Sequence, residues 1–444
     1  MTERFTRREF VATTGGAAVA AVLGGTGRAS AAARRRYAIV GTGVRAIGMW
    51  GRPVVREYQD VVEVVGLCDT NPLRAQVAQR AIGVSSPMFT RLDEMLDKAK
   101  PDVLMVTTVD AVHGDCIVAA LDRGIDVITE KPMVIDEAQC QAVLDAEKRA
   151  AKNIAVTFNY RYAPKHQKIK ELLMAGEIGR VTSVDFSWYL DTSHGADYFR
   201  RWHRLREKSG SLWVHKSTHH FDLINWWLDA DPVEVSALGS LNQYGKAGPF
   251  RHSHCRPCPH KSQCAYYWDI TKSQPLVDLY VNCESADGYH RDGCVFREDV
   301  DIADTMNAVV KYSTGVSMSY SVNTFMPIEG YRLAFNGTKG RLEVRDYERQ
   351  PWDPGMESEM HLIRNFGERV KIDIPQAEGG HGGGDTRLRD LVFRNVPVPE
   401  HLRLPGSRAG AMSCLTGVAA RKSAEIGQPV KIATLMPSMR PASE

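Results

Sequence analysis

The chain has 444 residues, which predicts two or three domains instead of one. Apolar residues make up 43% and charged residues 25% of the chain, a composition typical of folded globular proteins. The formal net charge of +3 is too small to indicate a nucleic-acid partner. No apolar run reaches membrane-spanning length, so no membrane partner is expected either.

The first 33 residues read as a targeting segment. Thr6-Arg7-Arg8-Glu9-Phe10-Val11 contains paired arginines, a mildly apolar stretch follows, and Ala29-Ser30-Ala31 offers a small-residue cleavage site. This pattern predicts a twin-arginine signal over residues 1–33 and a periplasmic or extracellular protein; an ordinary disordered tail is the alternative. Twin-arginine transport carries folded proteins. A nucleotide cofactor would therefore be loaded before export and would have to stay bound.

The stretch from Arg36 to Asp69 predicts a dinucleotide site. Tyr37–Val40 is a short apolar strand, and Gly41, Gly43 and Ala46 follow it with the spacing G-x-G-x-x-A. Such glycines allow a tight turn and a close approach of the pyrophosphate to the backbone, and the alanine lets the next helix pack near the strand. The cofactor would therefore contact a turn made of Gly41, Gly43, Val44, Arg45 and Ala46.

The acid at the end of the second strand indicates which cofactor binds. Val61–Cys68 is apolar and ends at Asp69, whose carboxylate would bind the adenosine ribose and repel a 2′-phosphate. NAD(H) is therefore expected, while Arg74 nearby keeps NADP(H) open as the less favoured choice.

Helices and strands continue to alternate as far as residue 155, which predicts a doubly wound parallel sheet over 34–155. Ligands bind outside the carboxyl ends of such strands. The cofactor-contacting residues expected there are Thr107, Thr108, His113, Glu130 and Lys131.

Strands dominate the second half, and their alternation predicts an α/β domain over 156–430 with a large, open, mainly antiparallel sheet. Trp213–Leu228 is expected to be a helix within it. Residues 431–444 are expected to form a C-terminal tail.

A cysteine-rich insertion is predicted at 242–295, because this stretch shows little periodicity and a loop of this length needs a covalent or metal staple. This stretch suits a structural Zn²⁺ held by Cys255, Cys258 and Cys264. The preferred fourth ligand is Cys294, and Cys283 is the alternative fourth ligand. An iron–sulfur cluster, disulfides and free thiols remain alternatives.

Several stretches together resemble the glucose–fructose oxidoreductase, inositol dehydrogenase and rhizopine-catabolism (Gfo/Idh/MocA) family. The matching pieces span nearly the whole chain after residue 33: Ala38–Ala46, Asp110-Ala-Val-His113, Gly124–Pro132, Asn159-Tyr-Arg-Tyr162, Gly176-Glu-Ile-Gly179, His219-His-Phe-Asp222, Asn336-Gly-Thr-Lys-Gly340 and the segment around Ala420. The resemblance implies oxidation or reduction of a sugar or polyol hydroxyl through a nicotinamide. It also implies a homo-oligomer, dimer or tetramer.

The resemblance assigns the catalytic lysine to Lys131, with Glu130 orienting it, and the catalytic histidine to His219. Family members commonly carry an aspartate one helical turn before that histidine, whereas this chain has His215 followed by Lys216. This departure makes His215 a further catalytic candidate and leaves the proton relay open.

The other substrate-contacting candidates lie near the family's substrate segment or in a glycine-rich loop. They are Tyr160, Arg161, Lys216, His220 and His381. A structural ion pair is an equal alternative for Arg161, and a merely flexible loop is an equal alternative for the segment around His381.

The sequence therefore predicts an exported oxidoreductase with tightly held NAD(H) and a sugar or sugar-derivative substrate. One alternative is a glycosidase that oxidises the sugar ring transiently, eliminates the aglycone and reduces again. Another is a non-catalytic sugar-binding protein on the same fold.

Overall fold

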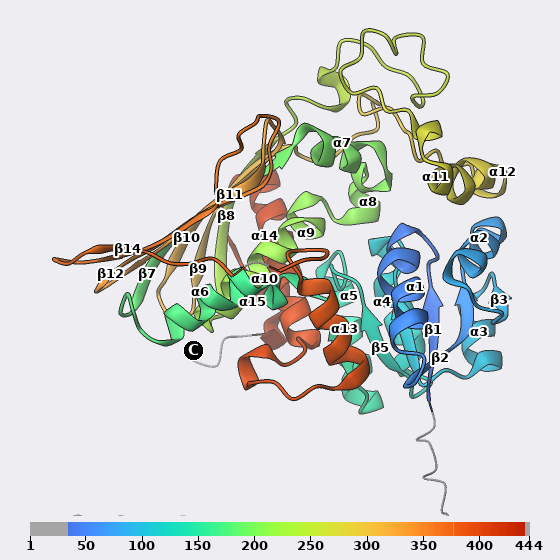
Figure 1. Cartoon of the computed structure of the whole chain (residues 1–444), viewed down its shortest axis with the longest axis horizontal. Helices are drawn as coiled ribbons and strands as arrows, with labels where there is room; N and C mark the ends of the chain where they lie inside the picture. The colour runs from blue at the N-terminus through green and yellow to red at the C-terminus, as the bar shows by residue number, and fades with distance from the viewer. Residues whose placement is uncertain (1–33, 376, 440–444) are drawn as a thin grey trace, which may run out of the picture. The chain divides into compact units, whose positions relative to one another are not determined.

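The computed structural model describes residues 34–375 and 377–439, so the predicted signal at 1–33 lies outside the described residues. From Arg34 onward the chain forms one unit built on two sheets (Figure 1). Across the described ranges, no helix combines the length and the apolar character needed to cross a bilayer.

The first sheet is parallel and has six strands in the order β3-β2-β1-β4-β5-β6. This order is that of a doubly wound dinucleotide-binding fold, which confirms the predicted fold class. The strands are β1 (Arg35–Val40), β2 (Val62–Cys68), β3 (Met88–Phe89), β4 (Val103–Val106), β5 (Asp126–Thr129) and β6 (Ile154–Val156). The helices between them are α1 (Arg52–Glu57), α2 (Pro72–Ile82), α3 (Leu92–Ala99), α4 (His113–Leu121) and α5 (Glu137–Ala150).

The turn after β1 depends on glycine. Gly41 has φ +82°, and a Cβ there would lie 2.7 Å from the backbone of Thr107, which directly follows the neighbouring strand β4. Ala46 is fully buried and begins a π-helical segment, η1 (Ala46–Gly51), which runs into α1. The helix expected after the glycine motif is therefore present, with its first turn wound more widely.

The second sheet has nine strands in the order β14-β13-β12-β11-β7-β10-β9-β8-β15. Only β7 and β10 pair in parallel, so the predicted mainly antiparallel sheet is confirmed. Burial alternates along β9 and β10, which leaves one face of the sheet packed and the other open. The strands are β7 (Val181–Asp191), β8 (Pro232–Ser240), β9 (Thr305–Tyr312), β10 (Ser317–Met326), β11 (Glu329–Gly337), β12 (Gly340–Arg349), β13 (Glu359–Arg364), β14 (Arg369–Lys371) and β15 (Val430–Lys431).

The predicted helix Trp213–Leu228 is two helices, α9 (Leu212–His215) and α10 (Ser217–Leu228), which meet at Lys216. At this break the His219 N–H donates to the carbonyl of Lys216. The carbonyl of His215 accepts a hydrogen bond from Lys131 Nζ. The break thus provides an acceptor for the lysine at the end of β5. The other helices on this side are α6 (Pro164–Met174), α7 (Thr192–Arg200) and α8 (Arg206–Ser209).

The end of the chain returns to the first sheet. Phe393 of α13 (Gly384–Arg394) packs edge-on against Tyr37 with ring centroids 5.4 Å apart. The almost fully buried helix α14 (Ser407–Ile426) contacts both α5 and β8. The described part of the predicted tail, 431–439, is not loose: β15 pairs with β8, and Ile432 of α15 (Ile432–Leu435) is buried.

The cysteine-rich insertion holds only short helices, α11 (Gln274–Leu279) and α12 (Glu284–Asp287), with 3₁₀ turns around them. In Figure 1 these two helices lie over α2 of the first sheet, and contacts between α11 and α2 agree with the view. The insertion therefore reaches the predicted nucleotide site.

Candidate active site

Lys131 follows the carboxyl end of β5 and points at the broken helix. Its Nζ donates to the carbonyl of His215 at 2.9 Å. Removal from water lowers the pKa of Lys131 to about 8, with Lys216 and Arg45 acting in the same direction and Asp110 and Glu130 opposing them. A lysine of this kind exchanges protons near neutral pH.

Glu130 binds groups other than the lysine that it was expected to orient. Its carboxylate accepts from Arg45 Nε and Trp50 Nε1, both at 2.6 Å. It acts on Lys131 through charge, which raises the pKa of the amine. The hydrogen bond that Glu130 accepts from Arg45 holds the Arg45 side chain beside the glycine turn.

His215 is paired with Asp110, a residue that sequence reasoning did not select. His215 Nδ1 and Asp110 Oδ2 lie 2.5 Å apart, and both side chains are buried. Burial raises the pKa of Asp110 and lowers the pKa of His215, so a separated charge pair is disfavoured and the two groups share one proton. The sequence feature from which Asp110 could have been selected is its place in the motif Asp110-Ala-Val-His113.

His219 lies flat on Tyr160, with ring centroids 4.4 Å apart and an interplanar angle of 18°. Its Nδ1 is buried and has no hydrogen-bond partner in the protein. Burial, followed by the charges of Lys131 and Lys216, lowers the pKa of His219, so the imidazole is neutral at neutral pH. Such a nitrogen can bind a substrate hydroxyl.

Lys216 completes this basic group. Its ammonium lies 4.8 Å from the ring centroid of Trp188 and 5.7 Å from that of Tyr160. Burial lowers its pKa, while Glu329 and Glu348 oppose that shift. Aromatic faces and carboxylates thus hold this cation beside Lys131 and His219.

The glycine-rich loop brings His381 to the same place. Its ring centroid is 5.3 Å from that of Tyr160 and 6.2 Å from that of His219. Asp385, which sequence reasoning missed, accepts from His381 Nδ1 at 3.1 Å and from Asn159 Nδ2 at 2.6 Å. Burial opposes ionisation of Asp385, but the His381 hydrogen bond and the Arg45 charge hold its pKa below the usual value.

A cavity of about 450 Å³ opens beside Tyr160 and His381. Its polar lining mixes carboxylates with cations and hydroxyls, a surface suited to a polyhydroxylated molecule. The charged and ionisable side chains of this lining include Lys165, His194, Glu329, Asp346 and Glu348.

Three sequence-predicted residues have structural partners. Arg161 donates to both carboxylate oxygens of Asp222, at 2.8 and 2.5 Å, so the structure gives it an ion pair in place of the predicted substrate contact. His220 is stacked on Trp188 and hydrogen-bonded to a tyrosine hydroxyl, away from solvent. His113 is buried and bridges the carbonyls of Thr108 and Pro132, so it positions the Lys131 turn from behind.

The nucleotide turn has its own hydrogen bonds. Asp69 accepts from the Thr42 N–H and hydroxyl, from the Asn71 N–H and from Arg74, at 2.8 to 3.4 Å. These four donors match the roughly four lone-pair sites of a carboxylate. Asp69 therefore does not have a free oxygen face ready for a ribose. Thr107 binds back to the carbonyls of Val40 and Gly41 and supports the turn.

The insertion closes over this turn. The Val44 N–H donates to the hydroxyl of Tyr280 at 3.2 Å, and Asn71 Nδ2 donates to the carbonyl of Cys283 at 2.9 Å. Asp287 accepts from Arg74 at 2.7 Å. No sequence pattern marked Tyr280 as part of the nucleotide site, because only the folded insertion brings it there.

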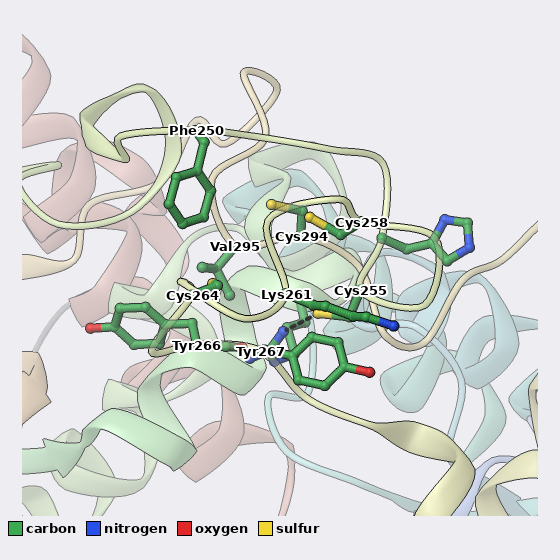
Figure 2. A pocket seen from close by; sticks show the side chains of 11 residues that line it. Phe250, Cys255, Cys258, Lys261, Cys264, Tyr266, Tyr267, Cys294 and Val295 are labelled. Atoms are coloured by element: carbon green, nitrogen blue, oxygen red, sulfur yellow. Dashed lines mark hydrogen bonds between the residues drawn. The ribbon is translucent and has the colours of Figure 1, made fainter.

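The cysteine cluster is brought together, but not as a zinc site. Cys255, Cys258, Cys264 and Cys294 line one small cavity (Figure 2), and Cys283 is not among its lining residues. Within the described ranges, no three cysteine, histidine or carboxylate side chains are grouped so that they could hold a metal ion. The expected zinc site therefore finds no support. All described cysteines are free thiols.

Comparison with known proteins agrees with this geometry. The model of the oxidoreductase family NAD-binding Rossmann fold matches residues 35–158, and that of the oxidoreductase family C-terminal alpha/beta domain matches residues 170–432. The chain belongs to the Gfo/Idh/MocA family of oxidoreductases.

Two curated relatives of this oxidoreductase match more than two thirds of the chain. YteT of Bacillus subtilis (strain 168) is 40% identical over 410 residues, which span 88% of this chain and 96% of YteT. Inositol 2-dehydrogenase of Salmonella paratyphi B is 24% identical over 310 residues, which span 68% of this chain and 85% of that protein.

Solved structures share the fold at low identity. Aldose–aldose oxidoreductase from Caulobacter crescentus, complexed with glycerol, has TM-score 0.60 and 17% identity, with 90% of this chain and 100% of that chain covered. WlbA dehydrogenase from Bordetella pertussis, in complex with NADH and UDP-GlcNAcA, has TM-score 0.61 and 19% identity, with 90% and 99% covered.

The lowered pKa of Lys131 predicts a pH dependence. Oxidation of a hydroxyl needs the neutral amine as proton acceptor, so single-turnover reduction of the bound nicotinamide should speed up as pH rises and level off above about 8. Lys216→Met removes a charge that lowers this pKa, so the midpoint should move to higher pH. Lys168→Met, which changes a half-buried lysine on α6 that pairs, among the described residues, only with Glu171 of the same helix, is the control. A midpoint that stays in place for Lys216→Met would contradict the assignment.

Proposed function

We propose that this protein oxidises or reduces a hydroxyl of a sugar or sugar derivative with a tightly held NAD(H). The observation that carries the proposal is that Lys131, with its lowered pKa, follows the carboxyl end of β5 close to neutral His219, whose ring stacks on Tyr160. Tyr160 in turn lines the polar cavity. A bound NAD⁺ would supply the hydride acceptor.

The residues fit such a cofactor at the turn after β1. A Cβ on Gly43 would come within 3.3 Å of the Tyr280 hydroxyl, so any larger residue would crowd this hydroxyl and the space beside the backbone. The N–H of Val44 faces the same space, where a pyrophosphate oxygen would compete with the Tyr280 hydroxyl for it. Gly41, Gly43, Val44 and Arg45 would hold the phosphates.

Lys131 is the group that moves the proton. In the oxidation direction its neutral amine accepts the hydroxyl proton, and in reduction its ammonium returns it. The hydrogen bond to the His215 carbonyl fixes Nζ in place. Because Asp110 and His215 share one proton, this pair adds no net charge beside Nζ. A neutral lysine is thereby maintained close to the operating pH.

His219 and Lys216 would hold the substrate oxygens. The unpartnered Nδ1 of His219 supplies one hydrogen bond, and the Lys216 ammonium steadies negative charge that develops on the oxygen. His381, beside Tyr160, would cover the sugar from the loop side.

The charge around Arg74 supports NAD(H) over NADP(H). Its guanidinium lies 3.4 Å from Asp69 and 2.7 Å from Asp287, so two carboxylates compensate its charge. A 2′-phosphate would have to displace one of them and would face the other.

Releasing Arg74 should therefore weaken the preference for NAD(H). Asp287→Asn removes one compensating charge, and we expect the ratio of the NADPH and NADH dissociation constants to fall by about tenfold, equivalent to roughly 1.4 kcal/mol. Asp278→Asn on the neighbouring α11, which binds only side chains of the insertion, is the matched control. Equal ratios in both variants would count against the assignment.

The function itself is tested by what the protein carries and makes. Denatured protein that has survived dialysis should release about one NAD(H) per chain, identified by mass spectrometry, and incubation with sugars should give a net oxidised or reduced sugar. Lys131→Met should keep the nucleotide and lose turnover by at least about 100-fold.

Other outcomes of this experiment point elsewhere. A released aglycone without net oxidation would identify a glycosidase. Full sugar-dependent activity in Lys131→Met would overturn the role of the lysine, and a protein that neither carries nor takes up nucleotide would leave only a sugar-binding role.

We also propose that the protein is exported by the twin-arginine route. Support comes from the Arg7-Arg8 pair and the small-residue site at Ala29-Ser30-Ala31. Replacing both arginines by lysine should retain the full-length chain in the cytoplasmic fraction, whereas the unchanged chain should appear outside it, shortened by its first ~30 residues. Equal distribution of the two chains would contradict export.

A further inference from the structure

The loop that carries His381 is built around the carboxylate of Asp385. The peptide N–H of Asp385 donates to the carbonyl of Gly380 at 3.3 Å, and that of Gly384 donates to the carbonyl of His381 at 3.3 Å. A Cβ added to Gly380 would collide with Asp385 Oδ2, so glycine at this position leaves room for the carboxylate. The glycine-rich sequence therefore lets the backbone wrap closely around this acid.

Three side chains gather at the Asp385 carboxylate. Its Oδ1 accepts from Asn159 Nδ2 at 2.6 Å, and both of its oxygens lie 3.1 Å from His381 Nδ1. Arg45 Nη1 lies 3.8 Å from Oδ2. Asp385 also lies in the first turn of α13, where a helix stabilises negative charge. Burial opposes its ionisation, but the His381 hydrogen bond and the Arg45 charge hold its pKa low, so the group is an ionised carboxylate.

The ionised acid determines which nitrogen of His381 is left for a ligand. A carboxylate can only accept hydrogen bonds, so His381 Nδ1 is the donor of this pair. In the neutral ring the other nitrogen, Nε2, then carries the lone pair. His381 lines the cavity beside Tyr160, so Nε2 belongs to the ring face that a sugar would meet.

The backbone of His381 adds a second sign of function. Its φ of +52° lies in the left-handed region, which few residues with a side chain adopt. Such a conformation persists where surrounding contacts hold it, and it is common at ligand sites. Here the contacts are those of the Asp385 carboxylate and of the Gly384 N–H.

We propose that Asp385 is a positioning residue for the substrate: it fixes His381 over the cavity, with Nε2 as a hydrogen-bond acceptor for a sugar hydroxyl. The ligand named here rests on the proposed function. Glu329, Asp346 and Glu348 in the same lining are acceptors as well, so a molecule rich in hydroxyl donors matches the cavity. A deoxy sugar without this hydroxyl would leave Nε2 without its donor and would bind more weakly.

The first test observes the His381 ring in the full chain. Nitrogen NMR of isotope-labelled histidine, in alkaline buffer where imidazole rings are neutral, should show the His381 proton on Nδ1, with the signal assigned by its loss in His381→Gln. Asp385→Asn keeps an oxygen acceptor and should keep this tautomer, whereas Asp385→Ala should move the proton to Nε2. Asp390→Asn is the matched control, because Asp390 lies on the same helix and binds the Tyr58 hydroxyl.

The second test measures sugar turnover. The probe is whichever of D-glucose, D-galactose, D-mannose and myo-inositol the unchanged chain turns over fastest. In Asp385→Ala its KM should rise about tenfold, the effect of one lost hydrogen bond, while single-turnover hydride transfer at saturating probe should change less than about twofold. Asp385→Asn should restore most of the KM, and the NAD(H) content should be the same in all variants.

Three results would overturn the proposal. They are a His381 proton on Nε2 in the unchanged chain, an unchanged tautomer in Asp385→Ala, and a KM increase in Asp390→Asn as large as that in Asp385→Ala. Failure of the proposed function looks different, because no probe sugar is then turned over while His381 Nδ1 is still protonated; the role of His381 toward a sugar would fall and its placement by Asp385 would stand. The unchanged chain decides the first result even if Asp385→Ala fails to fold.

Discussion

The site depends on one hydrogen bond, from Lys131 Nζ to the carbonyl of His215. That carbonyl is available because α9 and α10 meet at Lys216, where the His219 N–H binds the carbonyl of Lys216. The same break turns the His215 ring to Asp110 and sets His219 against Tyr160. The first sheet supplies the lysine and the second domain supplies its acceptor, so both must be folded together before the amine of Lys131 has a fixed place.

Burial, more than pairing, determines the protonation of this site. Lys131, Lys216 and His219 all lose water, and each has its pKa lowered mainly for that reason. Carboxylates lie nearby, but Asp110 shares a proton with His215 and Glu130 binds Arg45 and Trp50. A cluster that looks strongly basic in the sequence therefore has its positive charge reduced in the fold, because His219 is neutral and the pKa of Lys131 is about 8, while Lys216 remains its cation.

Local patterns predicted the parallel sheet, the glycine turn and the lysine at the end of β5, because each depends on residues close together in the chain. The sequence did not indicate Asp110 as the partner of His215, because the two residues lie more than a hundred positions apart. It did not indicate Asp385 as the partner of His381 either, because that pair lies in and next to a glycine-rich loop without periodicity. Arg161 could not be assigned in advance, since a bidentate pair with Asp222 and a substrate contact need the same guanidinium. The short strands β13 and β14 carry too little alternation to be predicted individually from the sequence.

The turn that holds the nucleotide already satisfies its own polar groups: Asp69 has four donors and the Val44 N–H has Tyr280. A nucleotide entering here exchanges one set of hydrogen bonds for another, and such exchanges contribute only about 1 kcal/mol each. If the nucleotide is retained for long, the reason would then be less its equilibrium affinity than the activation free energy for moving the insertion away from the turn. Entry and exit would be slow for the same reason, so a nucleotide bound during folding would exchange only slowly afterwards.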